Sequence, residues 1–319
     1  MHITEEMMDP ELRKTGKAIR QMMPYVTPTR IKLINKATDV LRGTNRTNLN
    51  YEQHYITRAD GSKLRICVYS PQTPQENVPG VLWIHGGGYA LELPELEASA
   101  FAQIANETGA VIVAPDYTRS PDRPYPAALE DCYASLEWLR DHTDEYGIRS
   151  DQLVVAGGSA GGGLTAALNL YARDKGEIAI AFQIAFYPML DDQPTASSLN
   201  NDALIWNTKS NEVSWRLYLG DLYGTHSIPA YAAPARAADL SGLPPMISFV
   251  GDLDPFYSET VTFIDRLAAS GVPTYFKVYS GAYHAFNIIK HAELANDANQ
   301  FLIDNFKYCM TQYFAEQPK

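Results

Sequence analysis

The chain has 319 residues, of which 45% are hydrophobic and 20% charged, a composition typical of a globular protein with one large core or two small ones. Its formal net charge of −11 and its lack of basic stripes argue against sequence-independent binding of nucleic acids, and we interpret the acidity as a source of solubility. Cys67, Cys132 and Cys309 are too few and too scattered for a disulfide framework or a zinc cluster, so we expect reduced thiols and no metal.

The N-terminal residues do not have the pattern of a targeting signal. Glu5, Glu6 and Asp9 stand where a signal peptide needs a basic start and an apolar core. The most apolar segment, residues 178–190, is interrupted by Gln183 and is too short to span a bilayer. From the sequence alone we therefore expect a soluble, cytoplasmic protein that does not bind membranes.

The predicted elements begin with helices and continue as an alternation of strands and helices. Two helical patterns, Pro10–Met23 and Pro28–Leu41, come before any strand, and a hairpin is predicted around Asp60-Gly61. Short apolar strands are predicted at 81–85, 110–117, 153–157, 178–188, 245–251 and 274–280, with helices at 95–108, 127–146, 160–174, 258–270 and 295–314. This alternation predicts an α/β fold whose mainly parallel sheet is covered by helices on both faces.

Two segments lie outside the alternation. Residues 1–48 precede the first strand, and residues 191–240 form an aromatic-rich insertion between two strands. An insertion of that size is usually functional. We therefore expect N-terminal cap helices in residues 1–48, a cap insertion in residues 191–240, and one main domain made of residues 49–190 and 241–319.

The sharpest motif is GGSAG at residues 157–161, a G-x-S-x-G sequence centred on Ser159. It lies between a predicted strand and a predicted helix, which is where a nucleophile elbow must lie. Glycines are needed there because the backbone turns sharply and packs against its neighbours. The following helix N-terminus favours developing negative charge. Alone the motif is weak, but in this context it predicts Ser159 as a nucleophile.

A second motif, HGGGY at residues 85–89, directly follows a predicted strand. A flexible connection would explain its glycines, but acyl transfer gives a stronger reason, because a tetrahedral oxyanion needs preorganised N–H donors. A loop of this type supplies part of the oxyanion hole in lipases and esterases. We assign the donors to the N–H groups of Gly86, Gly87 and Ala160. His85 is expected to orient the loop rather than to transfer protons.

The acid and the histidine of a triad must follow later in the chain. The predicted strand at 245–251 leads into a loop with Asp252 and Asp254, and the local sequence does not distinguish between them. His284 follows the strand at 274–280 after a short loop, whereas His291 lies on a predicted helix or its approach. Catalytic side chains of such sheets project from loops at the carboxyl ends of strands, so the spacing favours His284.

With these motifs in order, the sequence from about residue 62 to residue 314 resembles the bacterial hormone-sensitive-lipase-like esterases, also called family IV lipolytic enzymes. The resemblance rests on HGGGY (85–89), DYTRSPDRPYPAALED (116–131), GGSAGGG (157–163), YPMLDD (187–192), LPPMISFVGDLDPF (243–256) and GAYHAF (281–286). It implies an α/β-hydrolase fold with a helical cap. It also implies a homodimer, because members often associate through the last strand. In the family the acid is the aspartate of a D-P-L-like tripeptide, which implies Asp254 rather than Asp252.

Three positions depart from the family pattern. Gly158 replaces the common aspartate before the nucleophile, and Ser258-Glu259 stands where D-E is frequent. Glu92 occupies a position that is often glycine, with Glu95 and Glu97 close behind. Glu92 is therefore either a carboxylate facing the site or a solvated surface charge. The residues expected to line the substrate pocket are Tyr89, Glu92, Trp206 and Trp215.

The predicted function is a serine carboxylesterase that hydrolyses small, short-acyl esters through an acyl-enzyme on Ser159, without metal or organic cofactor. His284 would take the serine proton, and Asp254 would hold the imidazole in the required tautomer. One alternative is an amidase or formamidase with the same triad, which a comparison of ester and anilide substrates would separate. The other is a non-catalytic receptor for small ligands, although such proteins typically lack a triad member.

Overall fold

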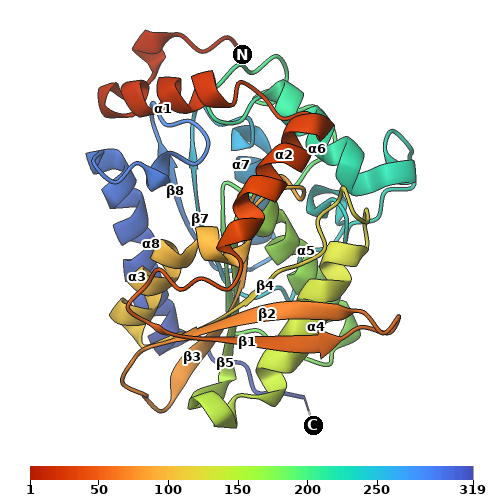
Figure 1. Ribbon diagram of the computed structural model, residues 1–319, viewed down its shortest axis with the longest axis vertical. Helices are drawn as coiled ribbons and strands as arrows, with labels where there is room; N and C mark the ends of the chain where they lie inside the picture. Colours follow the sequence, from red (N-terminus) through yellow and green to blue (C-terminus); the bar gives the residue numbers. More distant parts are fainter. Residues whose placement is uncertain (319) are drawn as a thin grey trace.

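The computed structural model describes residues 1–318 and contains one eight-stranded sheet in the order β1-β2-β4-β3-β5-β6-β7-β8 (Figure 1). The strands are β1 (Asn50–Thr57), β2 (Lys63–Ser70), β3 (Val78–Ile84), β4 (Val111–Pro115), β5 (Ile148–Gly158), β6 (Phe182–Phe186), β7 (Met246–Gly251) and β8 (Thr274–Tyr279). Strand β2 is antiparallel to β1 and β4, and the remaining pairs are parallel. The predicted hairpin and the mainly parallel sheet are confirmed.

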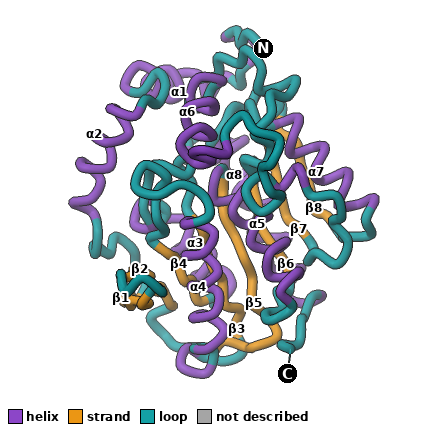
Figure 2. Tube along the Cα trace, turned by 90° about the vertical axis from the view of Figure 1, so that its right-hand side faces the viewer, coloured by secondary structure: helices purple, strands orange, loops and turns teal. Residues whose placement is uncertain are grey.

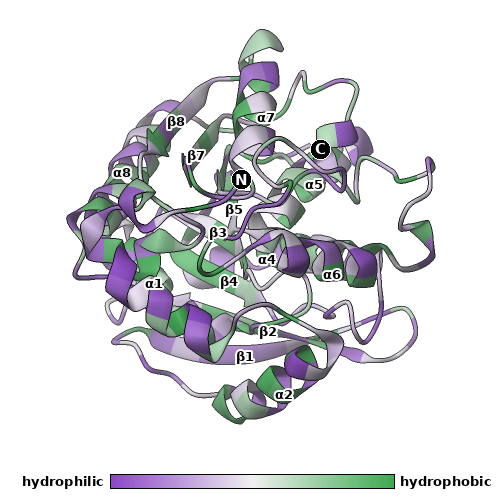
Figure 3. Cartoon of the chain, turned by 90° about the horizontal axis from the view of Figure 1, so that it is seen from above, coloured by the Kyte–Doolittle hydropathy of each residue, from purple (hydrophilic) through white to green (hydrophobic). Residues whose placement is uncertain are grey.

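Helices cover both faces of this sheet. They are α3 (Ala98–Thr108), α4 (Ala127–Asp141), α5 (Ala160–Lys175), α7 (Tyr257–Ala269) and α8 (Glu293–Gln312). Helix α3 packs beside α8, and α4 packs beside α5. Every residue of β3 and β4 is buried, as expected for strands covered on both sides. In Figure 3 the edge strand β1 is instead largely hydrophilic, in line with its mostly exposed residues.

Some element boundaries differ from the prediction. The helix predicted over residues 127–146 ends at Asp141, and a separate 3₁₀ turn, Asp144–Tyr146, precedes Gly147 at a φ of 65°. The strand predicted over residues 178–188 is shorter, because pairing with β5 begins only where Phe182 meets Val154.

The helices α1 (Pro10–Met22), α2 (Pro28–Thr38) and α6 (Thr208–Leu219) gather at one end of the molecule (Figures 1 and 2). Asn207 Nδ2 donates to the carbonyl of Pro24 at 2.9 Å, and the N–H of Val26 donates to Ser210 Oγ at 3.2 Å. Residues 1–48 and residues 191–240 therefore contact each other directly. None of the helices within residues 1–318 is both long and apolar enough to cross a membrane.

Candidate active site

Ser159 lies at the sharp turn between β5 and α5 with a φ of 58° and a ψ of −123°, unusual for a side-chain-bearing residue. The neighbouring backbone explains the glycines of the motif, because a Cβ on Gly157 or Gly161 would approach the carbonyl oxygen of Ile84 to 2.5 or 2.0 Å. The strained residue is held from both sides. Its N–H donates to Phe186 O at 3.1 Å, and its carbonyl accepts from Gly163 N–H at 2.9 Å.

Three side chains from the ends of three strands form a continuous hydrogen-bonded chain. His284 Nε2 lies 2.9 Å from Ser159 Oγ, and His284 Nδ1 lies 2.8 Å from Asp254 Oδ2. Asp254 is fully buried, and its other oxygen accepts the N–H of Phe256 at 2.8 Å. A neutral imidazole fits this arrangement when it donates from Nδ1 and accepts from the serine hydroxyl at Nε2.

The alternative acid and histidine lie apart from this chain of hydrogen bonds. Asp252 accepts from Ser280 Oγ at 2.9 Å and from Gly281 N–H at 2.8 Å, which ties the loop after β8 to the loop after β7. His291 is exposed, and its Nε2 lies 3.2 Å from the carbonyl of Glu11. The structure therefore brings Asp254, His284 and Ser159 together and leaves the two alternatives outside.

The glycine loop after β3 differs in one respect from the expectation. The N–H of Gly86 donates to Glu97 Oε1 at 2.9 Å, so in this structure it is not free to bind an oxyanion. Within residues 1–318, no hydrogen-bond acceptor is recorded for the N–H groups of Gly87, Gly88 or Ala160. The assignment of Gly86 as an oxyanion donor is therefore wrong for this conformation, because a carboxylate that the motif does not reveal already occupies its amide.

His85 is buried and stacks on Tyr117 with ring centroids 4.1 Å apart. Burial lowers the pKa of His85 to about 3, so the imidazole is neutral at physiological pH. Its Nδ1 lies 3.1 Å from the carbonyl oxygen of Gly86, and Tyr117 Oη donates to the same carbonyl at 3.2 Å. The side chain thus contacts the glycine loop rather than the serine, as expected of a residue that orients the loop.

A cavity of about 480 Å³ opens at Ser159 and His284. Trp206 and Glu92 line it as predicted, together with apolar side chains that include Ile19, Met23, Trp83, Leu91 and Phe186. Tyr89 and Trp215 are not among its lining residues, so this part of the prediction is wrong. Both are almost fully buried, and Tyr89 stacks on Tyr218 at 3.8 Å while its hydroxyl donates to Met189 O at 2.9 Å.

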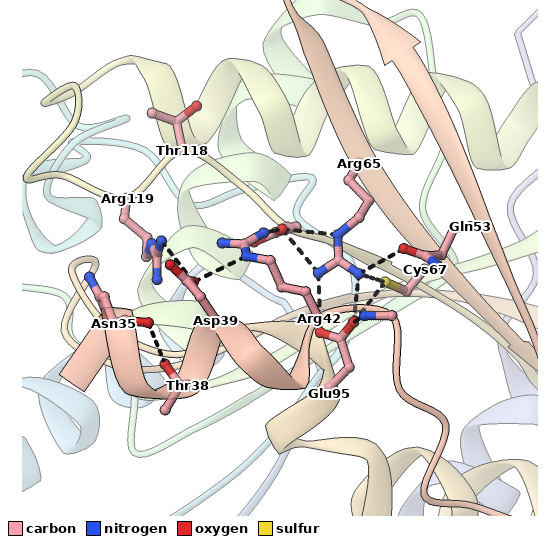
Figure 4. Close-up of polar contacts among 12 residues, drawn as sticks. Asn35, Thr38, Asp39, Arg42, Gln53, Arg65, Cys67, Glu95, Thr118 and Arg119 are labelled. Atoms are coloured by element: carbon pink, nitrogen blue, oxygen red, sulfur yellow. Dashed lines mark hydrogen bonds and ion pairs between the residues drawn. The ribbon is translucent and has the colours of Figure 1, made fainter. Parts of the chain in front are cut away.

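The three glutamates behind the glycine loop point in two directions. Glu95 accepts from Arg65 Nη1 at 2.5 Å and from the N–H of Gly43 at 2.7 Å, in a polar cluster that Figure 4 shows beside Cys67. Glu92 and Glu97 instead line the catalytic cavity. The sequence did not reveal Glu97 as a contact of the glycine loop, because its partners Trp83 and Gly86 lie more than ten residues earlier.

No group of three or more histidine, cysteine or acidic side chains among residues 1–318 could hold a metal ion. The three cysteines are free and buried. The arrangement described above can nevertheless perform acyl transfer with protein groups alone, since it combines a nucleophile, a base and free amide donors.

Comparison with known proteins agrees with this geometry. Residues 81–288 match a family model described as alpha/beta hydrolase fold. The esterase LipI of Mycobacterium tuberculosis is 37% identical over 65% of this chain and 65% of its own length, and the carboxylesterase NlhH of the same organism is 32% identical over 70% and 71%. The solved structure of a bacterial heroin esterase superposes with a TM-score of 0.88 at 30% identity, covering 97% of this chain and 99% of that chain.

Proposed function

Since this chain belongs to the hormone-sensitive-lipase-like (family IV) esterases of the α/β-hydrolase fold, we propose that it hydrolyses small, short-acyl carboxylic esters with Ser159 as its nucleophile. The chain is a serine carboxylesterase, and the observation that carries this assignment is the chain of hydrogen bonds from Asp254 through His284 to Ser159. A chromogenic ester assay on the purified protein is the direct test.

In the proposed mechanism His284 removes the Ser159 proton while Oγ attacks the ester carbonyl. Asp254 keeps the Nδ1–H tautomer and stabilises the imidazolium that forms. The tetrahedral oxyanion accepts from the free amides of Gly87 and Ala160, with Gly88 as the further donor in place of Gly86. The imidazolium then protonates the leaving alcohol. Water, deprotonated by the same imidazole, releases the acid and restores Ser159.

The cavity supports a small substrate. Its volume of about 480 Å³ lies in the lower part of the range for small-molecule sites, and most of its lining is apolar. Each methylene buried from water gains about 0.8 kcal/mol, or roughly fourfold in kcat/KM, until the cavity is full. We expect kcat/KM for p-nitrophenyl esters to peak at acyl chains of about two to six carbons and to fall beyond about ten. Faster hydrolysis of long-chain emulsified esters would contradict this.

Substrate charge should matter as well, because Glu92 and Glu97 line the cavity and no ion pair within 4.0 Å involves either of them in the described part of the chain. We expect anionic esters to be poor substrates compared with neutral esters of equal length. Glu95 takes no part in this effect, since Arg65 neutralises it. An anionic penalty that is absent in wild type, or that survives Glu92→Gln unchanged at pH 9, above the raised pKa of Glu92 of about 8, would contradict this.

Residues 1–48 and 191–240 are proposed to act as one cap over the site. Ile19 and Met23 from the first segment, and Ile205 and Trp206 from the second, line the same cavity. Replacing Met23, the residue directly after α1, by Trp should then shorten the longest accepted acyl chain, whereas Met22→Trp, at the exposed last residue of α1, should not. Equal effects of the two substitutions on chain-length preference would contradict a shared cap.

We further propose a cytoplasmic homodimer. The buried free thiols fit a reducing compartment, and the outer edge of β8 is unpaired within the described chain. Sedimentation equilibrium tests the dimer, and a Pro in place of Lys277 in β8 should shift the protein to monomers.

An amidase with the same triad is the remaining alternative, and it would cleave an anilide at a rate close to that of the matched ester.

A further inference from the structure

Two carboxyl groups, those of Glu92 and Glu97, lie beside the oxyanion loop and line the cavity that contains Ser159. The point where a Cβ on Gly86 would stand is 3.4 Å from Glu92 Oε2 and 3.6 Å from the Ser159 Cβ. The pair therefore lies next to the reacting atoms rather than at the mouth of the cavity. The mechanism above uses neither group.

Both oxygens of Glu97 have partners that fix the loop. Oε1 accepts the N–H of Gly86 at 2.9 Å, and Oε2 accepts the indole N–H of Trp83 in β3. The opposite side of the loop is held by Tyr117, whose hydroxyl donates to the Gly86 carbonyl. In a planar trans peptide the C=O and the following N–H point in opposite directions. Holding the Gly86 carbonyl against Tyr117 therefore turns the Gly87 N–H away from Tyr117, and Gly87 lines the cavity.

Glu92 provides the partner for Glu97. Burial, followed by the charge of Glu97 and hydrogen bonding to it, raises the pKa of Glu92 to about 8, which places the two carboxyl groups within reach of each other. Burial also raises the pKa of Glu97, although its bonds to Gly86 and Trp83 oppose that shift. The other titratable groups that face the pair, from the loops after β4, β6 and β8, are Tyr117, Tyr187, His284 and Lys290.

We propose that Glu92 and Glu97 are positioning residues that share one proton: neutral Glu92 donates to anionic Glu97, and Glu97 holds the Gly86 amide so that the oxyanion loop keeps its active conformation. This inference rests on the proposed esterase function. Removal of the shared proton leaves two adjacent buried carboxylates, which repel each other and place a second negative charge beside the developing oxyanion. The kcat should therefore fall at alkaline pH, whereas KM should change less.

The test is the pH dependence of kcat and KM for a neutral short-chain ester between pH 6 and pH 10, corrected for spontaneous hydrolysis with the Ser159→Ala protein. Wild type should lose kcat at alkaline pH with a midpoint near the raised pKa of Glu92, about 8. In Glu92→Gln this decrease of kcat at alkaline pH (the alkaline limb) should be absent, so that kcat at pH 9 is close to kcat at pH 7, because the amide also donates to Glu97 and cannot ionise.

Glu97→Gln should lower kcat roughly tenfold to a hundredfold at every pH, because the NH₂ of its amide must face the N–H of either Gly86 or Trp83. This loss is smaller than the ~10²–10³ lost when an oxyanion donor itself is removed. Glu97→Ala should lose at least as much. The matched control is Glu107→Gln at the exposed end of α3, which removes the same charge outside the cavity and should keep the wild-type profile.

A wild-type alkaline limb that persists in Glu92→Gln would overturn the proposal, as would an unchanged kcat in Glu97→Gln. If the two glutamates only stabilised the fold, their substitution would change stability without changing the pH at which kcat falls. Circular dichroism of each variant at each pH therefore distinguishes a structural role from a positioning role. Failure of the esterase assignment itself is recognised separately, because wild type would then hydrolyse no ester at any pH.

Discussion

Asn in place of Asp254 is the substitution that tests the triad most sharply. Both oxygens of Asp254 accept from donors, Oδ2 from His284 Nδ1 and Oδ1 from the N–H of Phe256, each at 2.8 Å. An asparagine has one acceptor oxygen only, so its NH₂ must face one of these two groups. The Phe256 amide cannot change its role, and leaving it opposed by a second donor would cost about 1–3 kcal/mol. The imidazole can adapt by moving its proton to Nε2.

The asparagine oxygen should therefore remain on Phe256, and the imidazole should take the wrong tautomer. With its proton on Nε2, His284 has no lone pair facing Ser159 Oγ and cannot act as the base. The corresponding change in another serine hydrolase lowers kcat by about 10⁴, which corresponds to about 5.4 kcal/mol in the activation free energy. The free energy of unfolding should change by less than about 1 kcal/mol, because both hydrogen bonds survive in altered form.

The assay is kcat for a soluble p-nitrophenyl ester at pH 7, with urea denaturation of the same preparations. Asp252→Asn is the matched control, because Asp252 also accepts two hydrogen bonds, from Ser280 Oγ and Gly281 N–H, but contacts neither Ser159 nor His284. It should retain kcat within about threefold, since the Ser280 hydroxyl can rotate to accept instead. Asp254→Asn retaining more than about a tenth of wild-type kcat, or Asp252→Asn proving the more damaging change, would refute this reasoning.

Ser159→Ala should lower ester hydrolysis by about 10⁶ without unfolding the protein, and more than about one per cent residual activity in pure protein would contradict its role as nucleophile. Gly158→Ala should lower the free energy of unfolding by about 1–3 kcal/mol, because a Cβ there would lie 2.2 Å from a ring carbon of Phe186. A decrease below about 0.5 kcal/mol, measured by urea denaturation, would show that the ring can move to make room. For Glu92, the raised pKa means that the folded state holds the proton more tightly than the unfolded state, so its contribution to stability is lost as pH rises from about 4.5 to about 8. The stability of Glu92→Gln relative to wild type should thus increase over this window, by at most about 1.4 kcal/mol per pH unit, and parallel stability curves for the two proteins would contradict the assignment.

The sequence predicts the nucleophile turn because only glycine satisfies the backbone there. Gly157 and Gly161 both approach the carbonyl of Ile84 too closely for a Cβ, so the glycines of the motif are required by the close contact of β5 and α5 with β3. The sequence also distinguishes His284 from His291 by local position, since of these two only His284 closely follows the carboxyl end of a strand. Motifs of this kind can be recognised in a sequence because the geometric requirement that each one meets lies within one short stretch of the chain.

The three glutamates could not be separated in this way. Glu92, Glu95 and Glu97 are chemically similar and lie within six residues of one another. What distinguishes them is the partner that each meets, Arg65 on β2 for Glu95 and Trp83 on β3 for Glu97. Such pairings depend on how the strands are ordered in the sheet, which a single sequence does not state. Likewise, aromatic composition identified Trp206 in the cavity but did not exclude Trp215, whose ring packs against Tyr89 instead.

Backbone strain gives an independent reason to assign Glu92 to the catalytic apparatus. Seven non-glycine residues of the described chain have a positive φ, and four of them line the catalytic cavity: Glu92, Ser159, Tyr187 and Ala285. A left-handed conformation costs a residue with a side chain roughly 1–2 kcal/mol, whereas glycine adopts it without that cost. In the family that the sequence resembles this position is often glycine, whereas this chain has Glu92 there at a φ of 73°, in spite of strain that glycine would remove. Strain of this kind concentrates at sites where it positions a reacting group, as it does at Ser159, and a solvated surface charge would give no reason to retain it.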